Sequence, residues 1–225
     1  MTDSFKVACV QTNSGPDVAV NVTAAVALGL DARGAGADLI AFPETVNIMQ
    51  ADKAALRGKT GPEDRSAALA SFRGLARETA AWVLVGSMAV EDRPGGKMVN
   101  RSLLIDGGGG IKARYDKIHM FDVDLGGNET HRESADFEPG GKAVVAETPW
   151  GGLGMTICYD LRFPRLYRML AQHGAKFIAV PSAFTRVTGE AHWHVLARAR
   201  AIETGCYIFA PAQCGDHDGG RRTFG

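Results

Sequence analysis

Residues 151–168 read GGLGMTICYDLRFPRLYR, and the rest of the chain is interpreted around them. Their pattern predicts a buried strand over 153–157 that runs directly into a helix, with Cys158 at the turn. A side chain on such a bend stands clear of the backbone, and the free N–H groups of the helix face whatever that side chain attacks. This environment would stabilise a thiolate. Cys158 is therefore a candidate nucleophile, and the alternative is a small buried core residue.

Composition limits the class of protein. The chain has 225 residues, 45% of them hydrophobic, and 25 Lys+Arg against 25 Asp+Glu. This predicts one domain over 1–225 with a sizeable core. Zero net charge favours neither a nucleic-acid partner nor a membrane surface, and no apolar run is long enough to span a bilayer. The N-terminus lacks a signal-peptide pattern and the four cysteines lack C-x-x-C spacing, so we expect a reduced, cytoplasmic protein.

Apolar runs alternate with amphipathic segments along the chain. Strands are predicted over 5–11, 37–42, 82–89, 99–106, 111–116, 143–148, 153–157, 176–180 and 206–213. Helices are predicted over 22–33 with Asn21 as the cap, from Pro62 to about 81, after Cys158, and over 190–204. This order predicts an α/β fold with mixed sheets. The chain stops at 225 where a further strand is expected, so we expect C-terminal strands to be missing.

Two more stretches carry chemistry. Glu44 follows Pro43 at the end of a buried strand, where open α/β sheets place their ligands. Burial would raise its pKa toward the range of a general base; a solvated strand-end glutamate is the alternative. Lys117 follows the strand IKARYD and would lower the pKa of a nearby thiol or stabilise an oxyanion; a surface lysine is the alternative.

Taken together, AFPET, YDKIHMF and GMTICYDLRFP resemble the Glu, Lys and Cys motifs of the nitrilase superfamily of carbon–nitrogen hydrolases, in the same order. The resemblance covers essentially the whole chain. It implies a four-layer αββα sandwich with two mixed sheets, and a homodimer or higher homo-oligomer formed through helices. It also implies a second glutamate, which matches Glu133 in HRESADFEPGG. The superfamily continues beyond GRRTFG into further strands, and these are the strands that we expect to be missing.

The resemblance also implies a mechanism without a metal or cofactor. Glu44 takes the proton of Cys158, and the thiolate attacks an amide carbonyl. Lys117 and the backbone N–H of Tyr159 stabilise the oxyanion, and water then hydrolyses the thioester. Glu133 is expected to orient Lys117 and the substrate amide, and a share in the base role stays open.

The substrate is a finer question. CYDLRFPRLYR and CYIFAPAQCG resemble the Nit amidases, whose substrates are small α-keto acids with a terminal amide. The resemblance favours those acting on deaminated glutathione over the omega-amidases acting on 2-oxoglutaramate. A cation should meet the substrate carboxylate: Arg162 is the first candidate, with an ion pair to Asp160 as its alternative. Three further candidates are weaker: Thr185, Arg186 and His131.

Other functions stay open at this point. A nitrilase cleaving a C≡N bond is less favoured, because CYDLRFP resembles the amidase branch. A non-catalytic relative serving as an interaction domain is the alternative from a different class. His192 and His194 point to different faces of a predicted helix, so we do not expect them to share a metal.

Overall fold

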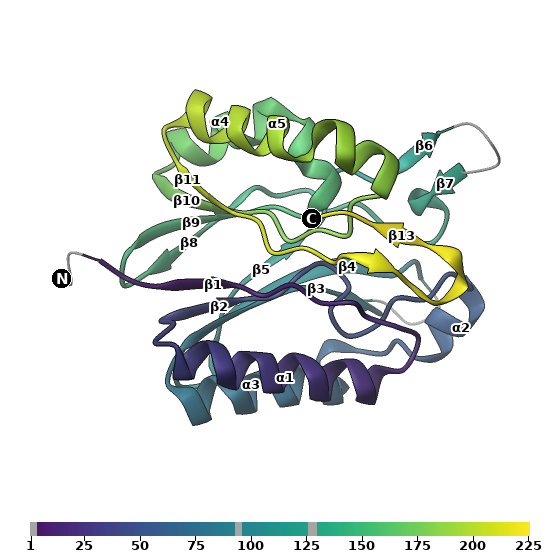
Figure 1. The fold of residues 1–225 in the computed structure, drawn as a ribbon, viewed down its shortest axis with the longest axis horizontal. Coiled ribbons are helices and arrows are strands. Elements are labelled where there is room, and N and C mark those ends of the chain that lie inside the picture. The colour runs from purple at the N-terminus through teal and green to yellow at the C-terminus, as the bar shows by residue number, and fades with distance from the viewer. Residues whose placement is uncertain (1–3, 93–95, 126–129) are drawn as a thin grey trace.

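The computed structural model describes residues 4–92, 96–125 and 130–225. Two mixed sheets lie face to face, and helices cover the outer face of each (Figure 1). The order of layers is helix, sheet, sheet, helix. This arrangement confirms the predicted four-layer αββα sandwich.

The first sheet runs in the order β1-β2-β3-β4-β5. Its strands are β1 (Val7–Cys9), β2 (Leu39–Ala41), β3 (Trp82–Val90), β4 (Val99–Ile105) and β5 (Ile111–Asp116). The first three are parallel, whereas β4 and β5 form the antiparallel hairpin predicted around the glycine run. Parallel neighbours bring the ends of β2 and β3 to one edge, and Glu44 follows β2 there.

The second sheet runs in the order β11-β10-β9-β8. Its strands are β8 (Val144–Thr148), β9 (Gly151–Met155), β10 (Ala175–Ala179) and β11 (Tyr207–Phe209). Here β9, β10 and β11 are parallel, and β8 pairs antiparallel with β9. Cys158 follows β9 at the carboxyl end of this parallel set, as Glu44 does in the other sheet.

Each sheet has its own pair of helices. These are α1 (Val18–Gly34) and α3 (Ala67–Thr79) on the first sheet, and α4 (Pro164–Gln172) and α5 (Arg186–Thr204) on the second (Figure 1). Two predicted starts were wrong. Asp17, not Asn21, caps α1, because the Asn21 side chain lies buried against Gly15 and Asn47. Ser66 caps α3, and Pro62 only precedes a 3₁₀ turn.

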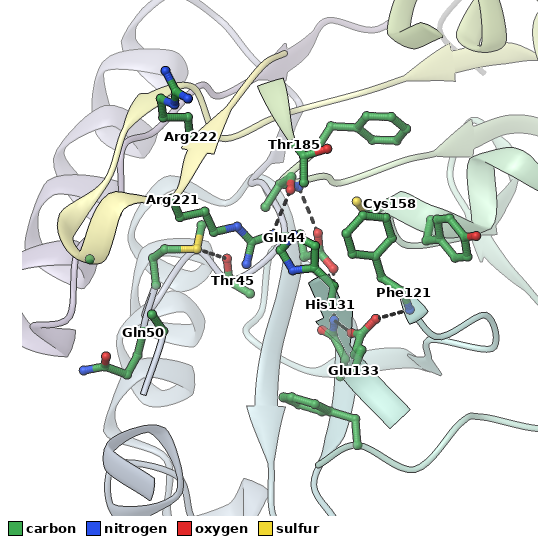
Figure 2. Close-up of a pocket in the computed structure, with 18 of the residues that line it drawn as sticks. Glu44, Thr45, Gln50, Phe121, His131, Glu133, Cys158, Thr185, Arg221 and Arg222 are labelled. Atoms are coloured by element: carbon green, nitrogen blue, oxygen red, sulfur yellow. Dashed lines mark hydrogen bonds between the residues drawn. The ribbon is translucent and has the colours of Figure 1, made fainter. Parts of the chain in front are cut away.

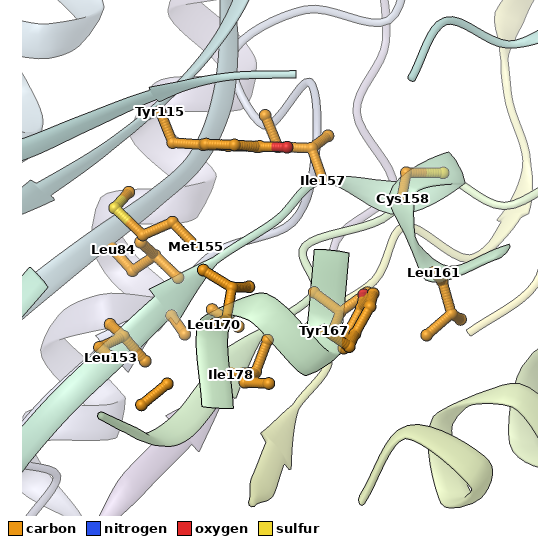
Figure 3. Packing of buried hydrophobic residues seen from close by; sticks show 14 of the residues in the cluster. Leu84, Tyr115, Leu153, Met155, Ile157, Cys158, Leu161, Tyr167, Leu170 and Ile178 are labelled. Carbon is orange, nitrogen blue, oxygen red and sulfur yellow. The ribbon is translucent and has the colours of Figure 1, made fainter. Parts of the chain in front are cut away.

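The core between the sheets is apolar and continuous. Leu84, Leu104 and Tyr115 of the first sheet pack in one cluster with Leu153 and Met155 of the second. The cluster continues past the end of β9 to Cys158 (Figure 3). Burial of these side chains stabilises the face-to-face pairing by roughly 25 cal/mol per Å² of apolar surface. The nucleophile candidate therefore belongs to the apolar cluster between the two sheets.

The predicted long loop over 117–139 contains structure of its own. Strands β6 (Asp122–Asp124) and β7 (Thr130–Arg132) pair antiparallel, and a 3₁₀ turn at Glu133–Ala135 follows. The short helix α2 (Lys53–Gly58), capped by Asp52, was not predicted. Near the end of the chain, β12 (Gly215–Asp216) pairs with β13 (Arg222–Thr223).

Candidate active site

Glu44 is placed by a close approach of two backbones. The segment Phe42–Glu44 leaves β2 and passes directly over Gly86 of β3. A Cβ on Gly86 would collide with the carbonyl oxygens of Phe42 and Pro43, so only glycine fits there. Glu44 is 4% exposed, and the next residue, Thr45, has a left-handed φ of 54°. Such a φ in a β-branched residue is strained and fixes the direction in which the chain leaves the glutamate.

Cys158 lies on a strained bend as well. Its φ is 47°, and its N–H donates to the carbonyl oxygen of Pro181 at 2.9 Å. A 3₁₀ helix (Cys158–Arg162) begins at this residue, and the α-helix begins only at Pro164, so the helix predicted after the strand starts as a 3₁₀ helix. The bend itself is present, and the side chain reaches the pocket that also contains Glu44 (Figure 2).

Asp160 holds this turn in place. Its carboxylate is fully buried and accepts hydrogen bonds from the N–H of Ile157 at 2.8 Å and the hydroxyl of Tyr115 at 2.7 Å. The Nδ1 atom of His119 lies 2.6 Å from its other oxygen. Because these partners come from both sheets, the conformation at Cys158 depends on the pairing of the sheets.

Lys117 and Glu133 complete a buried ion cluster. The Nζ atom of Lys117 lies 3.0 Å from Oε1 of Glu44 and 2.9 Å from Oε2 of Glu133. The side-chain amide of Asn100, on β4, donates to both carboxylates at 3.0 and 3.3 Å. The N–H of Phe121 donates to Glu133 at 2.7 Å, and the N–H of Ala183 donates to Glu44 at 2.9 Å.

The electrostatics differ from two expectations. Burial alone would raise the pKa of Glu44, but Lys117 and Arg221 outweigh it, so the pKa lies below its ordinary value and the group is a carboxylate at neutral pH. Burial and the charge of Glu44 raise the pKa of the Cys158 thiol, and Lys117 offsets this only in part. The resting site therefore contains an ionised base and a neutral thiol, not the predicted stabilised thiolate.

Lys117 keeps its proton in this environment. Burial disfavours the ammonium form, but Glu133 and Glu44 together raise the pKa of Lys117 well above its ordinary value. The side chain is therefore a cation at neutral pH. A fixed positive charge beside a neutral thiol suits the stabilisation of an oxyanion.

A pocket of about 760 Å³ opens onto this cluster. Its walls include every predicted site residue except Arg162: Glu44, Lys117, His131, Glu133, Cys158, Tyr159, Thr185 and Arg186. The ring of His131 lies against Phe121, and Thr185 is the N-cap residue of α5. Arg186 lies 3.4 Å from Asp216, so its charge is partly neutralised.

Arg162 lies just outside the pocket wall. Its guanidinium stacks over the ring of Phe184, 5.1 Å from the centroid, and contacts His192. Asp160 is held by other partners, and Arg162 is not among the residues that line the cavity. Its role toward the substrate stays a prediction.

His192 and His194 diverge as predicted, since His192 contacts Arg162 while the ring of His194 meets Phe224. Within residues 4–92, 96–125 and 130–225, no three His, Cys, Asp or Glu side chains are grouped as metal ligands. In the same ranges, no helix has the length and apolar content needed to cross a bilayer.

Sequence reasoning missed three participants. Asn100 lies inside the apolar strand VNRSLLI, where the only signal is a polar side chain at a buried position. The N–H of Ala183 has no signal at all, because it is a backbone group. Arg221 follows a Gly-Gly turn near the end of the chain, far in sequence from the three motifs, and the fold brings it to Glu44.

A model of the carbon–nitrogen hydrolase family matches residues 6–225. The chain belongs to the carbon–nitrogen hydrolase family. A deaminated glutathione amidase of Yersinia enterocolitica is 44% identical over 221 residues, which cover 97% of this chain and 77% of that protein. Carbon–nitrogen hydrolases thus resemble this chain along nearly its whole length, as the motifs predicted.

Solved structures agree with the fold. The NitFhit protein of C. elegans superposes with a TM-score of 0.87 at 32% identity, and the match covers 98% of this chain and about half (54%) of that protein. An amidase from Nesterenkonia sp. AN1, solved as a variant with one glutamate changed to glutamine, has a TM-score of 0.83 at 25% identity over 98% of this chain and 82% of that one. In that amidase, acrylamide has added to the active-site cysteine.

Proposed function

We propose that the protein is an amidase that hydrolyses the terminal amide of a small α-keto acid, with deaminated glutathione as the favoured substrate, through a thioester on Cys158. The observation that carries the proposal is the group of Glu44, Lys117 and Glu133 around one thiol in a single pocket. The 44% identity to a deaminated glutathione amidase supports the substrate, and the reactive cysteine of the Nesterenkonia amidase supports the nucleophile.

The acylation half-reaction follows from the charges. Glu44, ionised at rest, accepts the thiol proton as the sulfur forms a bond to the amide carbon. Since the pKa of the thiol is raised and that of Glu44 is lowered, this transfer is uphill unless the developing oxyanion is stabilised at the same time. Lys117 and the N–H of Tyr159 supply that stabilisation, each worth about 100- to 1,000-fold in rate. Glu44 then delivers its proton to the amide nitrogen, the C–N bond breaks and the amine leaves: cysteinylglycine from deaminated glutathione, or ammonia from a primary amide such as 2-oxoglutaramate.

Deacylation reuses the same groups. Glu44 takes a proton from water as its oxygen attacks the thioester carbon, and the C–S bond breaks. The proton returns to the sulfur, which restores the thiol and releases the carboxylic acid. Glu133 and Asn100 keep Lys117 and Glu44 in position during both halves, because Lys117 donates to Glu133 and Asn100 donates to both Glu44 and Glu133.

The test is hydrolysis of deaminated glutathione, followed through the cysteinylglycine amine that it releases, and of 2-oxoglutaramate, followed through ammonia, measured side by side. Cys158→Ala should reduce turnover by at least about 10,000-fold, since no other group can form the thioester. Cys206→Ala is the matched control: Cys206 is equally buried but bonds to the carbonyl of Ala175, outside the pocket, and its loss should leave kcat unchanged.

The outcomes separate the alternatives. Preference for 2-oxoglutaramate would move the protein to the omega-amidases. A folded protein that hydrolyses neither substrate would contradict the proposal and favour an interaction domain.

We also propose a homo-oligomer and a reducing, cytoplasmic location. Outward-facing apolar residues on and after α5 support the first: Val195, Ile202 and Tyr207 are 66%, 82% and 71% exposed. All four cysteines are free thiols, which supports the second. Sedimentation of the wild type and of Ile202→Asp tests the oligomer: a monomeric wild type would contradict it.

A further inference from the structure

Arg221 is a pocket cation that helps to keep Glu44 ionised but has no assigned contact with the substrate. It belongs to the segment Gly219–Arg222, which forms one wall of the pocket opposite Cys158. Its Nη2 atom donates to the carbonyl oxygen of Ala183 at 3.0 Å. Its Nε atom is buried and has no hydrogen-bond partner among the residues that the structure describes. A buried donor without a partner costs about 1–3 kcal/mol, so a ligand that accepts from it would be favoured.

The other cations that line the pocket are engaged or point elsewhere: Lys53 lies over the ring of Phe137, and Arg222 points away from Glu44 (Figure 2). Lys117 is shared between two carboxylates, Arg186 lies beside Asp216, and Arg132 donates to the carbonyl oxygens of Val123 and His131. Arg221 forms no ion pair within residues 4–92, 96–125 and 130–225. Its guanidinium, with a buried donor aimed at no acceptor among the described residues, can therefore receive an anion from outside.

The position of Arg221 ties that anion to the reacting centre. The peptide of Ala183 accepts from Arg221 through its oxygen and donates to Glu44 through its nitrogen. Figure 2 shows Arg221 extending toward Glu44, whereas the neighbouring Arg222 points away from it. An anionic group on Arg221 would thus lie beside the base and the nucleophile, within the reach of one small molecule.

We propose that Arg221 binds the carboxylate of the amide substrate and so makes the enzyme selective for anionic amides over neutral ones. The inference rests on the proposed amidase function and names the residue that recognises the acid end of its substrate. The guanidinium offers two parallel N–H groups to a carboxylate, which is the geometry that arginine provides best. Arg162, outside the pocket wall, is not required for this contact.

The experiment compares two amides that differ in one group. Succinamate carries a carboxylate where butanamide carries a methyl group. Arg221→Gln should lower kcat/KM for succinamate by about 30-fold, mainly through KM, because one charge-assisted contact is lost. For butanamide the change should stay below about threefold. Arg222→Gln, which removes the same charge one residue away, should leave the ratio of the two substrates as in the wild type.

A second measurement does not need turnover. Succinamate binding is measured by calorimetry on Cys158→Ala and on Cys158→Ala/Arg221→Gln, with thermal denaturation to verify folding. Weaker binding by about 30-fold in the double variant is expected.

Equal losses for both amides, or unchanged succinamate binding, would show that Arg221 only supports the fold and would overturn the inference. Absence of succinamate binding to Cys158→Ala would overturn it too. If the wild type releases no ammonia from any amide, the proposed function fails, and calorimetry still decides the role of Arg221.

Discussion

Two ion clusters begin at adjacent residues, Asp116 and Lys117, and they differ in burial and in charge balance. Arg101 binds Asp116 at 2.7 Å, Glu63 at 3.1 Å and Asp92 at 3.0 Å, and Arg114 also reaches Glu63. The Asp92 side chain is 49% exposed, so water also solvates its carboxylate. In the other cluster one lysine holds Glu44 and Glu133, and none of the three side chains exceeds 14% exposure.

The difference separates a stabilising network from a reactive one. The Arg101 cluster fastens β4 and β5 to the chain before α3, and none of its residues lines the pocket. The Lys117 cluster keeps two carboxylates near one cation and a neutral thiol, an arrangement that is costly unless every partner is present. Changes in the first cluster should therefore alter stability alone, and changes in the second should alter activity first.

The largest expected effect is on activity. Glu44→Gln should lower kcat by about 1,000-fold or more, because the amide cannot accept the thiol proton. Lys117 keeps Glu133 as a partner, so the melting temperature should change little. Glu63→Gln makes the same chemical change in the Arg101 cluster and should leave kcat within twofold. A Glu44→Gln protein that keeps more than a tenth of wild-type ammonia release would contradict the role of Glu44 as the base and of its cluster as the reactive one.

Removal of the buried cation should have the largest effect on stability. Lys117→Met leaves two buried carboxylates without their shared partner, at a cost of about 3–5 kcal/mol near neutral pH. One of the two would take up a proton, so its folded-state pKa would rise above the unfolded value of about 4.3. A raised pKa contributes stability below the unfolded value that is lost as pH rises, so the deficit relative to wild type should grow with pH. Urea denaturation at pH 5 and 7.5 measures this, and equal deficits would contradict it.

The Arg101 cluster predicts the converse result. Arg101→Met should lower the free energy of unfolding by about 2 kcal/mol, less than for a fully buried pair because water reaches the freed carboxylates. Its kcat should stay within twofold of wild type. Arg114→Met is the control: this side chain is 48% exposed, and its loss should cost less than about 1 kcal/mol. Urea denaturation with parallel ammonia assays measures both effects. A large loss of kcat in Arg101→Met would show that the Arg101 cluster also supports activity and would contradict the distinction between the two clusters.

The contrast also shows what the sequence could predict. Glu44, Lys117 and Cys158 each follow an apolar strand. The apolar pattern of the sequence alone predicts such strands and the residues at which they end. The sheets, the hairpin at the glycine run and the gathering of the three motifs were therefore predictable. The helix starts were less predictable. Asn21 is a plausible start for α1 and Pro62 for α3, and only tertiary contacts place the caps at Asp17 and Ser66 instead.

The features that the sequence could not predict depend on contacts between distant segments of the fold. The pKa directions at Glu44 and Cys158 could not be read from residue types, because burial and neighbouring charges oppose each other there and only distances show which wins. Arg221 was missed for a related reason. Its segment has no motif, and it reaches Glu44 only because β12 and β13 fold back over the ends of both sheets.

The smallest expected effect is the response of activity to pH. The pKa of Glu44 lies below its ordinary value of about 4.3, so the base is fully ionised above that pH. The thiol and Lys117 keep their protons beyond the ordinary cysteine value of about 8.5, because burial and Glu44 raise the pKa of the thiol and the two carboxylates raise that of the lysine. We therefore expect kcat/KM to change by less than about twofold between pH 6 and 9, since this ratio reports the free enzyme. An alkaline limb near pH 8.5 would show that Cys158 titrates like an exposed thiol, and that the Lys117 cluster is as open to water as the Arg101 cluster.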